Sequence, residues 1–163
     1  MKKVLDEYLS ELPLVITQAL DGIHNPAARC VIIPGTPKGK ARPRMTRRGQ
    51  VYTPSATSTV EALAKAVAIS QCPAAPYDHP LKLDLLAIMP VPKSWTKTKR
   101  AEALAGHIRP AVTPDFDNIA KLYCDAMNNV LWVDDRQIVD GRSIKCYGTM
   151  PAAILWCWPA EYP

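Results

Sequence analysis

Prolines punctuate this chain and constrain what it can fold into. The sequence holds 16 Pro and 7 Gly among 163 residues, a ratio that favours rigid, extended loops over flexible linkers. The segments between them have helical or strand-like patterns, without a regular β-α-β order. A chain of this length forms one compact domain in most proteins. We therefore predict an α+β fold, in which a small mixed β-sheet packs with helices.

Apolar residues recur at helical spacing in three parts of the chain, apart from an acidic segment treated below. They predict an N-terminal helix or helix pair over residues 2–21, a helix over 58–71, and a short helix to Leu104 from Ser94 or Thr96. Pro13 is expected to end or kink the first segment. Ser58 and Glu61 have the S-x-x-E spacing of a capping box, so the second helix is expected to begin there.

Short apolar runs predict the strands. They cover residues 30–33, 81–89, 136–147 and 151–158. In the second run, leucines alternate with Lys82 and Asp84, a pattern typical of a strand with one face inward. The last two runs are linked near Gly148 and are interpreted as a hairpin.

The composition excludes several classes of protein. No run approaches the roughly 18 uncharged apolar residues of a membrane span, and the N-terminus has acids where a signal peptide would be apolar. We therefore expect a soluble, cytoplasmic protein without a membrane partner. The five Cys are odd in number and never form C-x-x-C, so neither a zinc ribbon nor a redox pair is indicated.

The net charge of +5 hides a strong segregation along the chain. Residues 22–60 have seven basic residues and no acid, residues 82–109 have a charge of +4, and residues 115–140 have a charge of −4. In the first stretch, prolines keep the backbone extended, and the planar fork of arginine suits phosphate. Binding of a polyanion is therefore a better interpretation than a solvated loop. The candidate DNA-binding residues are Lys38, Lys40, Arg42, Arg44, Arg47 and Arg48.

The acidic segment begins with two aspartates at i, i+2. Pro114 favours an extended backbone, on which Asp115 and Asp117 point to one side. Asp117 or Asn118 is then expected to cap a helix, and Asn129 suits the left-handed position at its end. The apolar face of this helix is Ile119, Leu122, Tyr123, Ala126 and Met127.

A short strand, VLWVDD, is expected to follow and to bring in two further acids. Neighbours in a strand face opposite ways, so only one of Asp134 and Asp135 can converge on the first pair. Three adjacent carboxylates resist ionisation unless a cation lies between them, and oxygen ligands favour Mg²⁺ or Mn²⁺ over zinc. Lys121, one turn after Asp117, can face the same cluster and stabilise charge or orient a carboxylate. Each acid alone would more often be a cap or a turn residue, but the combination favours metal-dependent phosphate chemistry.

With these residues identified, the sequence resembles the RusA family of Holliday junction resolvases, commonly encoded by phages and prophages. The similar elements are GTPKGKARPR, the YTP that follows, DFDNIAK, the DA-M-N helix end and DDRQI, which together cover roughly residues 30–147. The first 28 or so residues have no counterpart, so we expect a helical extension over residues 1–28 and a nuclease domain over 29–163. Asn129 stands where many members have Gly.

The resemblance implies a homodimeric α/β fold and Mg²⁺-dependent cleavage of four-way DNA junctions by paired, symmetric nicks during recombination and repair. It also implies that Asp115, Asp117 and Asp135 are catalytic metal ligands and that Lys121 is the essential lysine, and so it selects Asp135 over Asp134. Two other hypotheses stay open from the residues themselves. One is a non-catalytic basic DNA-binding protein, and the other is a metal-dependent phosphohydrolase of a small substrate.

Overall fold

A four-stranded mixed sheet organises the molecule. The computed structural model describes residues 1–42, 44–45, 49, 51–52 and 55–161. The strands are β1 (Arg29–Pro34), β4 (Leu81–Pro90), β5 (Ile138–Gly148) and β6 (Ala152–Pro159), in the order β1-β6-β4-β5. β6 is antiparallel to both β1 and β4, whereas β5 is parallel to β4. The predicted α+β fold with a small mixed sheet is confirmed.

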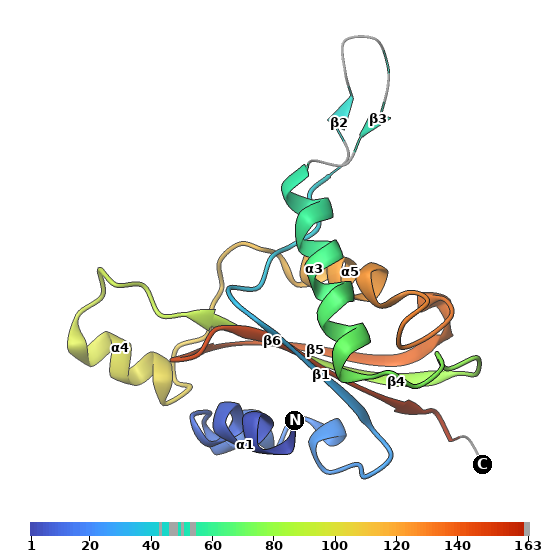
Figure 1. Cartoon of the computed structure of the whole chain (residues 1–163). Coiled ribbons are helices and arrows are strands. Elements are labelled where there is room, and N and C mark those ends of the chain that lie inside the picture. Colours follow the sequence, from blue (N-terminus) through green and yellow to red (C-terminus); the bar gives the residue numbers. More distant parts are fainter. Residues whose placement is uncertain (43, 46–48, 50, 53–54, 162–163) are drawn as a thin grey trace.

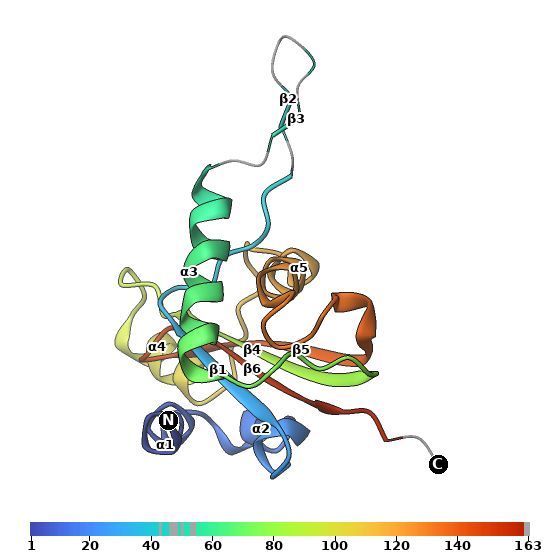
Figure 2. The same cartoon turned by 45° about the vertical axis from the view of Figure 1, so that its right-hand side comes forward.

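Helices cover both faces of this sheet, as Figures 1 and 2 show. α3 (Ser55–Gln71) and α5 (Phe116–Met127) lie on one face, and α1 (Lys2–Ser10), α2 (Leu14–Thr17) and the 3₁₀ turn η1 (Asp21–Ile23) lie on the other. α4 (Lys97–Leu104) packs at one end of the sheet, where Ala103 contacts Met89 and Tyr147. The sheet is therefore the middle layer of three.

Strand β4 is buried on both faces, which corrects the expected one-sided pattern. Leu83 and Leu85 pack under α3 and α5, whereas Leu86 and Ile88 pack against the N-terminal helices. Even Asp84 is only 3% exposed. The reason is that helices pack on both faces of the sheet over β4, so neither of its faces reaches solvent.

The predicted hairpin of the last two strands is wrong. β5 and β6 lie on opposite sides of β4. β6 is buried over almost its whole length, so it takes a central position, while the first half of β5 is largely exposed and tolerates the edge. Hydrophobic burial, which is a property of the whole sheet, therefore overrides closeness in sequence.

Helix boundaries agree with the sequence in part. α1 and α2 confirm the helix pair separated near Pro13, and the side chain of Thr96 accepts a hydrogen bond from the backbone N–H of Lys99 to cap α4. The capping box at Ser58 is wrong, because α3 begins at Ser55 and therefore contains both Ser58 and Glu61. Glu61 has a different role, which is described with the site.

The N-terminal segment is joined to the sheet by polar contacts. The backbone N–H of Gly22 donates to Oδ2 of Asp84 at 2.7 Å, and the guanidinium of Arg142 donates to the carbonyl of Ala19. Gly22 also packs so closely that an added Cβ would lie 2.4 Å from Cβ of Trp156. The second face of the sheet therefore depends on residues that precede β1.

We expect Asp84→Asn to change how the stability of the fold depends on pH. Burial, and then the charge of Asp21, raise the pKa of Asp84 above its ordinary value of 3.8, although the hydrogen bond from Gly22 opposes this. A carboxyl whose pKa is higher in the folded state binds protons more tightly there, so folding loses stability as pH rises through the range just above 3.8. Asn keeps an acceptor for Gly22 without this loss.

Urea unfolding between pH 3 and pH 7 measures this effect. The free energy of unfolding of Asp84→Asn relative to the natural protein should increase as pH rises above 3.8 and then level off. Asp78→Asn is the matched control, since the side chain of Asp78 is 88% exposed. A difference for Asp84→Asn that does not vary with pH would contradict the prediction.

Candidate active site

The basic segment begins by lying against the start of α5. The backbone N–H of Lys40 donates to the carbonyl of Asn118 at 2.8 Å. A Cβ at Gly39 would lie 2.7 Å from Cβ of Pro114, so a glycine is needed for this close approach. Farther along, β2 (Arg44–Met45) pairs antiparallel with β3 (Val51–Tyr52), and these strands stand away from the body near the start of α3 (Figure 1).

The six candidate DNA-binding residues are placed differently. Lys38 and Arg42 are exposed, and the backbone of Arg44 is in β2. Arg47 and Arg48 lie outside the described residues. Lys40 is half-buried among acids, so it differs from its neighbours.

Lys40 forms ion pairs with acids from two helices. Its Nζ lies 2.7 Å from Oε1 of Glu61 in α3 and 2.5 Å from Oδ2 of Asp125 in α5. Burial lowers the pKa of Lys40, but the hydrogen bonds and charges of Asp125 and Glu61 outweigh this and raise it. Asp125 also lies near a second lysine, since its Oδ1 is 3.7 Å from Nζ of Lys121. Asp125 thus connects the basic segment to the candidate catalytic lysine.

Sequence reasoning missed both Asp125 and Glu61. The i, i+4 spacing of Lys121 and Asp125 was a usable signal for one ion pair. No local pattern could have joined Lys40 to Glu61, because these residues meet only when the basic segment crosses α3 and α5.

Helix α5 begins two or three residues earlier than expected. Asp115 occupies its N-cap, in place of Asp117 or Asn118, although no side-chain capping bond forms there. Oδ2 of Asp115 accepts only a long 3.5 Å hydrogen bond from the amide of Asn118. The carboxylates of Asp115 and Asp117 are exposed at the helix N-terminus, where the helix dipole favours negative charge.

The rest of α5 follows the sequence prediction. The five residues of its expected apolar face are all buried: Ile119, Leu122, Tyr123, Ala126 and Met127. Full burial of a side chain such as Leu122 contributes about 2 kcal/mol. Asn129 has a φ of 62°, which confirms the left-handed residue after the helix. Packing of this apolar face on the sheet therefore fixes the orientation of α5, and with it the side of the helix on which Asp115 and Asp117 lie.

The predicted strand VLWVDD is wrong. The backbone N–H of Asn129 donates to the carbonyl of Trp132 at 2.7 Å, and the indole of Trp132 donates to the side chain of Asn128 at 2.9 Å. These bonds fold the segment into a turn, which leads into the 3₁₀ helix η2 (Asp135–Gln137). Asp134 and Asp135 therefore differ in role because one of them caps η2, and not because they point to opposite faces of a strand.

Asp134 is the structural member of the pair. Its side chain accepts a hydrogen bond from the backbone of Arg136 at 3.0 Å, and its own N–H donates to Oε1 of Gln137 at 2.9 Å. Together these bonds form a capping box. The carboxylate of Asp135, in contrast, makes no hydrogen bond or ion pair within the part of the chain that the structure describes, although its backbone carbonyl accepts a hydrogen bond from Ile138.

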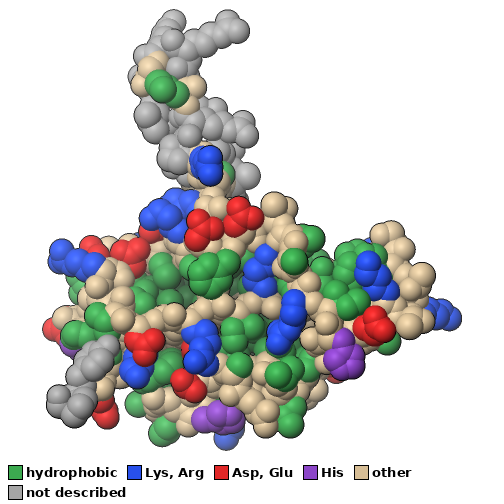
Figure 3. Space-filling model, turned by 180° about the vertical axis from the view of Figure 1, so that it is seen from behind, with side chains coloured by type: hydrophobic (Ala, Val, Ile, Leu, Met, Phe, Trp, Pro, Cys, Tyr) green, Lys and Arg blue, Asp and Glu red, His purple; other side chains and the backbone are tan. Residues whose placement is uncertain are grey.

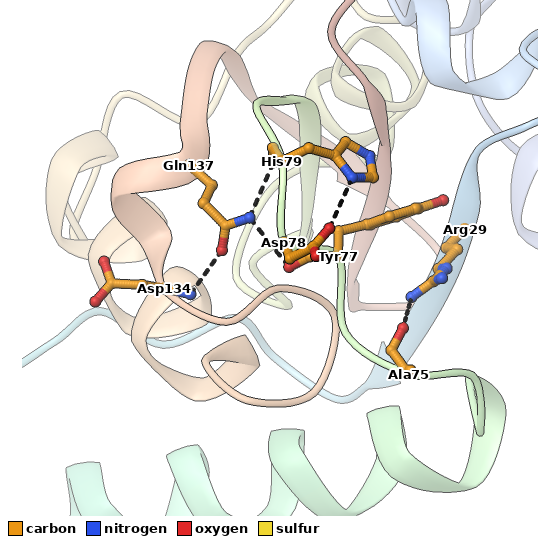
Figure 4. Close-up of polar contacts among 7 residues, drawn as sticks. All are labelled: Arg29, Ala75, Tyr77, Asp78, His79, Asp134 and Gln137. Carbon is orange, nitrogen blue, oxygen red and sulfur yellow. Dashed lines mark hydrogen bonds and ion pairs between the residues drawn. The ribbon is translucent and has the colours of Figure 1, made fainter.

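Gln137 attaches this turn to the loop before β4 (Figure 4). Its Nε2 donates to the carbonyls of Tyr77 at 3.0 Å and His79 at 2.9 Å. The same loop is held by Arg29, whose guanidinium donates to the carbonyl of Ala75 at 2.7 Å and lies 3.7 Å from the ring centre of Tyr77. Asp135 is therefore positioned by a well-braced turn.

Cys124 lies among the charged groups of the site. Burial, followed by the charges of Asp135 and Asp125, raises the pKa of its thiol to about 12, while Lys121 opposes the shift. The thiol is therefore protonated at neutral pH. The charges of Asp135 in η2 and of Asp125 and Lys121 in α5 therefore all act on this one side chain.

A further lysine holds the loop that leads to Asp115. Lys145 of β5 donates from Nζ to the carbonyl of Val112 at 2.5 Å and to the carbonyl of Pro114 at 2.8 Å. Sequence reasoning missed this residue, because nothing local distinguishes it from other surface lysines.

The aspartates of this region differ in whether their carboxylates already have a partner. Asp125 is neutralised by two lysines, and Asp134 is used in a cap. Among the described residues, Asp115, Asp117 and Asp135 have no cationic partner, so this all-oxygen set has the chemistry that a divalent ion requires. Within those same residues, no three His, Cys, Asp or Glu side chains lie close enough to hold an ion. The metal triad stays a prediction.

The back of the molecule carries charges of both signs. Acidic and basic side chains lie side by side just below the point where the hairpin leaves the body, next to hydrophobic side chains (Figure 3). Such mixed charge suits a surface that must hold both a cation and a polyanion.

The chain is similar to known proteins over most of its length. A family model described as endodeoxyribonuclease RusA matches residues 34–155, which include the basic segment, α5 and η2. The chain is also 33% identical over 122 residues to an uncharacterized protein, YqaN, of Bacillus subtilis (strain 168). That match covers 72% of this chain and 86% of that protein. No helix in the described ranges is long and apolar enough to cross a membrane.

Proposed function

This chain belongs to the RusA endodeoxyribonuclease family, and we propose that it cuts four-way DNA junctions by paired, symmetric nicks. The observation that supports this most strongly is the set of three aspartates at α5 and η2 that have no cationic partner among the described residues, together with an exposed basic segment. A non-catalytic DNA-binding protein would have no need to brace Asp135 through Gln137 and a capping box. A small-substrate phosphohydrolase would not need the basic segment.

Asp115, Asp117 and Asp135 are the residues that would hold Mg²⁺, with Mn²⁺ as a substitute. When bound, such an ion supplies positive charge at the scissile phosphate and makes a water molecule more acidic. Lys121 is 62% exposed, so its ammonium can reach either a phosphate oxygen or a carboxylate. Its ion pair with Asp125 would hold the ammonium group against the surface of α5 until the negative charge of the transition state develops.

The exposed Lys38 and Arg42 would contact the phosphates of DNA, with Arg44, Arg47 and Arg48 farther along the same segment. These contacts position the duplex without reading its sequence. Two protomers related by a two-fold axis would match the symmetry of a junction and place one site on each of two strands. A homodimer is therefore part of the proposal.

A cleavage assay tests this function directly. The protein should nick a synthetic four-way junction in Mg²⁺ and should leave a linear duplex and a flap substrate of the same sequences largely intact. Tight, salt-dependent binding to the junction without any nicking would favour the non-catalytic DNA-binding protein. Weak binding that hardly depends on salt would favour the small-substrate enzyme.

A further inference from the structure

An apolar hollow opens between α5 and the edge strand β5. Its volume is about 160 Å³. The residues that define it are Phe116, Ala120 and Cys124 of α5, Leu85 of β4, and Gly141 and Ser143 of β5. Sequence patterns gave no indication of it, because its walls come from three elements that are distant along the chain.

Gly141 creates the space. It pairs with Leu83, and Ser143 pairs with Leu85, so both β5 residues lie on the sheet face that α5 covers. A Cβ at Gly141 would meet only Cγ2 of Ile138, at 3.4 Å, which is an ordinary contact. Any larger side chain at this position would therefore enter the hollow.

Two side chains of the hollow are not explained by the fold alone. The hydroxyl oxygen of Ser143 is buried and has no hydrogen-bond partner among the described residues, an arrangement that costs about 1–3 kcal/mol. The ring of Phe116 is 58% exposed at the start of α5. Mostly apolar walls with a few polar groups, here Ser143 and Arg142, are typical of a ligand subsite.

The hollow lies beside α5, whose first turn carries two of the three aspartates of the proposed metal site. Phe116 stands between Asp115 and Asp117 in the chain, and Cys124 lies in the electric field of Asp135. A ligand in the hollow would therefore lie near the proposed metal site.

We propose that this hollow holds one unpaired nucleobase of the strand being cut, an inference that rests on the proposed nuclease function. The base would stack on Phe116, and its polar edge would satisfy the hydroxyl of Ser143. A phosphate is the wrong ligand, because the walls are apolar and the guanidinium of Arg142 is already bonded to Ala19. Bases at a branch point are easily unstacked, so a subsite of this kind would select branched DNA over duplex.

Gly141→Val tests the proposal, because it fills the hollow without touching an aspartate. Valine suits a strand, so the fold should be retained. The nicking rate of a four-way junction should fall about 5- to 100-fold, since stacking of one base is worth about 1–3 kcal/mol. Val139→Ile adds volume on the same strand at a residue that is 51% exposed and outside the hollow, and it should nick normally.

A fluorescent base analogue then reports the occupant. 2-Aminopurine is placed in turn at each position around the cut, and the junction is bound in Ca²⁺ so that it stays intact. One position should become brighter with the natural protein and should stay dim with Gly141→Val. Ser143→Ala should weaken this signal, and Ser143→Thr, which keeps the hydroxyl, should restore it.

The outcomes separate the two proposals. If the natural protein does not nick junctions, the proposed function fails. If it nicks them and Gly141→Val does so equally, with the same 2-aminopurine signal, the base subsite is wrong. If Gly141→Val instead breaks a dimer in sedimentation experiments, the hollow is a contact between subunits and the base subsite is again wrong.

Discussion

Asp117→Asn is expected to abolish nicking of a four-way junction while leaving junction binding intact or tighter. Asp117 has no cationic partner among the described residues and is exposed at the N-terminus of α5, so its charge is available to a divalent ion. Loss of that charge should lower the single-turnover nicking rate at least about 10²-fold. Binding, measured by fluorescence anisotropy in Ca²⁺, should not weaken, because one negative charge that faces DNA is removed.

Asp134→Asn is the matched control for this prediction. The change is chemically the same, and the asparagine oxygen can still accept the hydrogen bond from the backbone of Arg136, so the cap before η2 is kept. This variant should nick at the natural rate. Nicking by Asp117→Asn at the natural rate, or an equal loss in Asp134→Asn, would show that the aspartates have been assigned wrongly.

The sequence was informative where structure depends on local periodicity. The apolar face of α5, the left-handed Asn129 and the presence of β1 and β4 were all predictable, because each depends on neighbours within about two turns or one strand. The strand predicted at VLWVDD failed because Asn128 and Trp132 bond to each other and close a turn. The apolar composition of a short run does not distinguish a strand from a turn of this kind.

Strand order was beyond local patterns for a different reason. The chain makes β6 directly after β5, yet β6 pairs with β1 and β4, where helices cover both faces of the sheet and bury almost the whole strand. The position of β5 at the edge in turn exposes Gly141 and Ser143 to the hollow beside α5. A site that depends on this order therefore could not be derived before the topology was known.

The candidate site shows the same division. Asp115, Asp117 and Lys121 were found from their spacing, because one helix start holds all three. The different roles of Asp134 and Asp135 follow from the capping box with Gln137, and those of Lys38 and Lys40 follow from the acids that surround only Lys40. Residue type and spacing indicate which groups are available, and tertiary contacts decide which of them are already neutralised.

Lys38→Met and Lys40→Met should therefore have different effects, although the two lysines are two residues apart. Lys38 is exposed, so its loss should reduce the slope of the logarithm of DNA affinity against the logarithm of salt concentration by about 1, without a change in stability. Loss of Lys40 leaves Glu61 and Asp125 facing each other without a cation. The free energy of unfolding should fall by about 1–2 kcal/mol, less than for a fully buried pair because these side chains keep some contact with water.

Urea unfolding and salt titration of junction binding, done on both variants, measure the difference. Lys40→Arg is a useful third variant, because it keeps the positive charge between the two acids and should retain most of the stability. If Lys40→Met were as stable as the natural protein and reduced the salt slope as Lys38→Met does, Lys40 would contact DNA phosphate directly. Its ion pairs with α3 and α5 would then have to open when DNA binds.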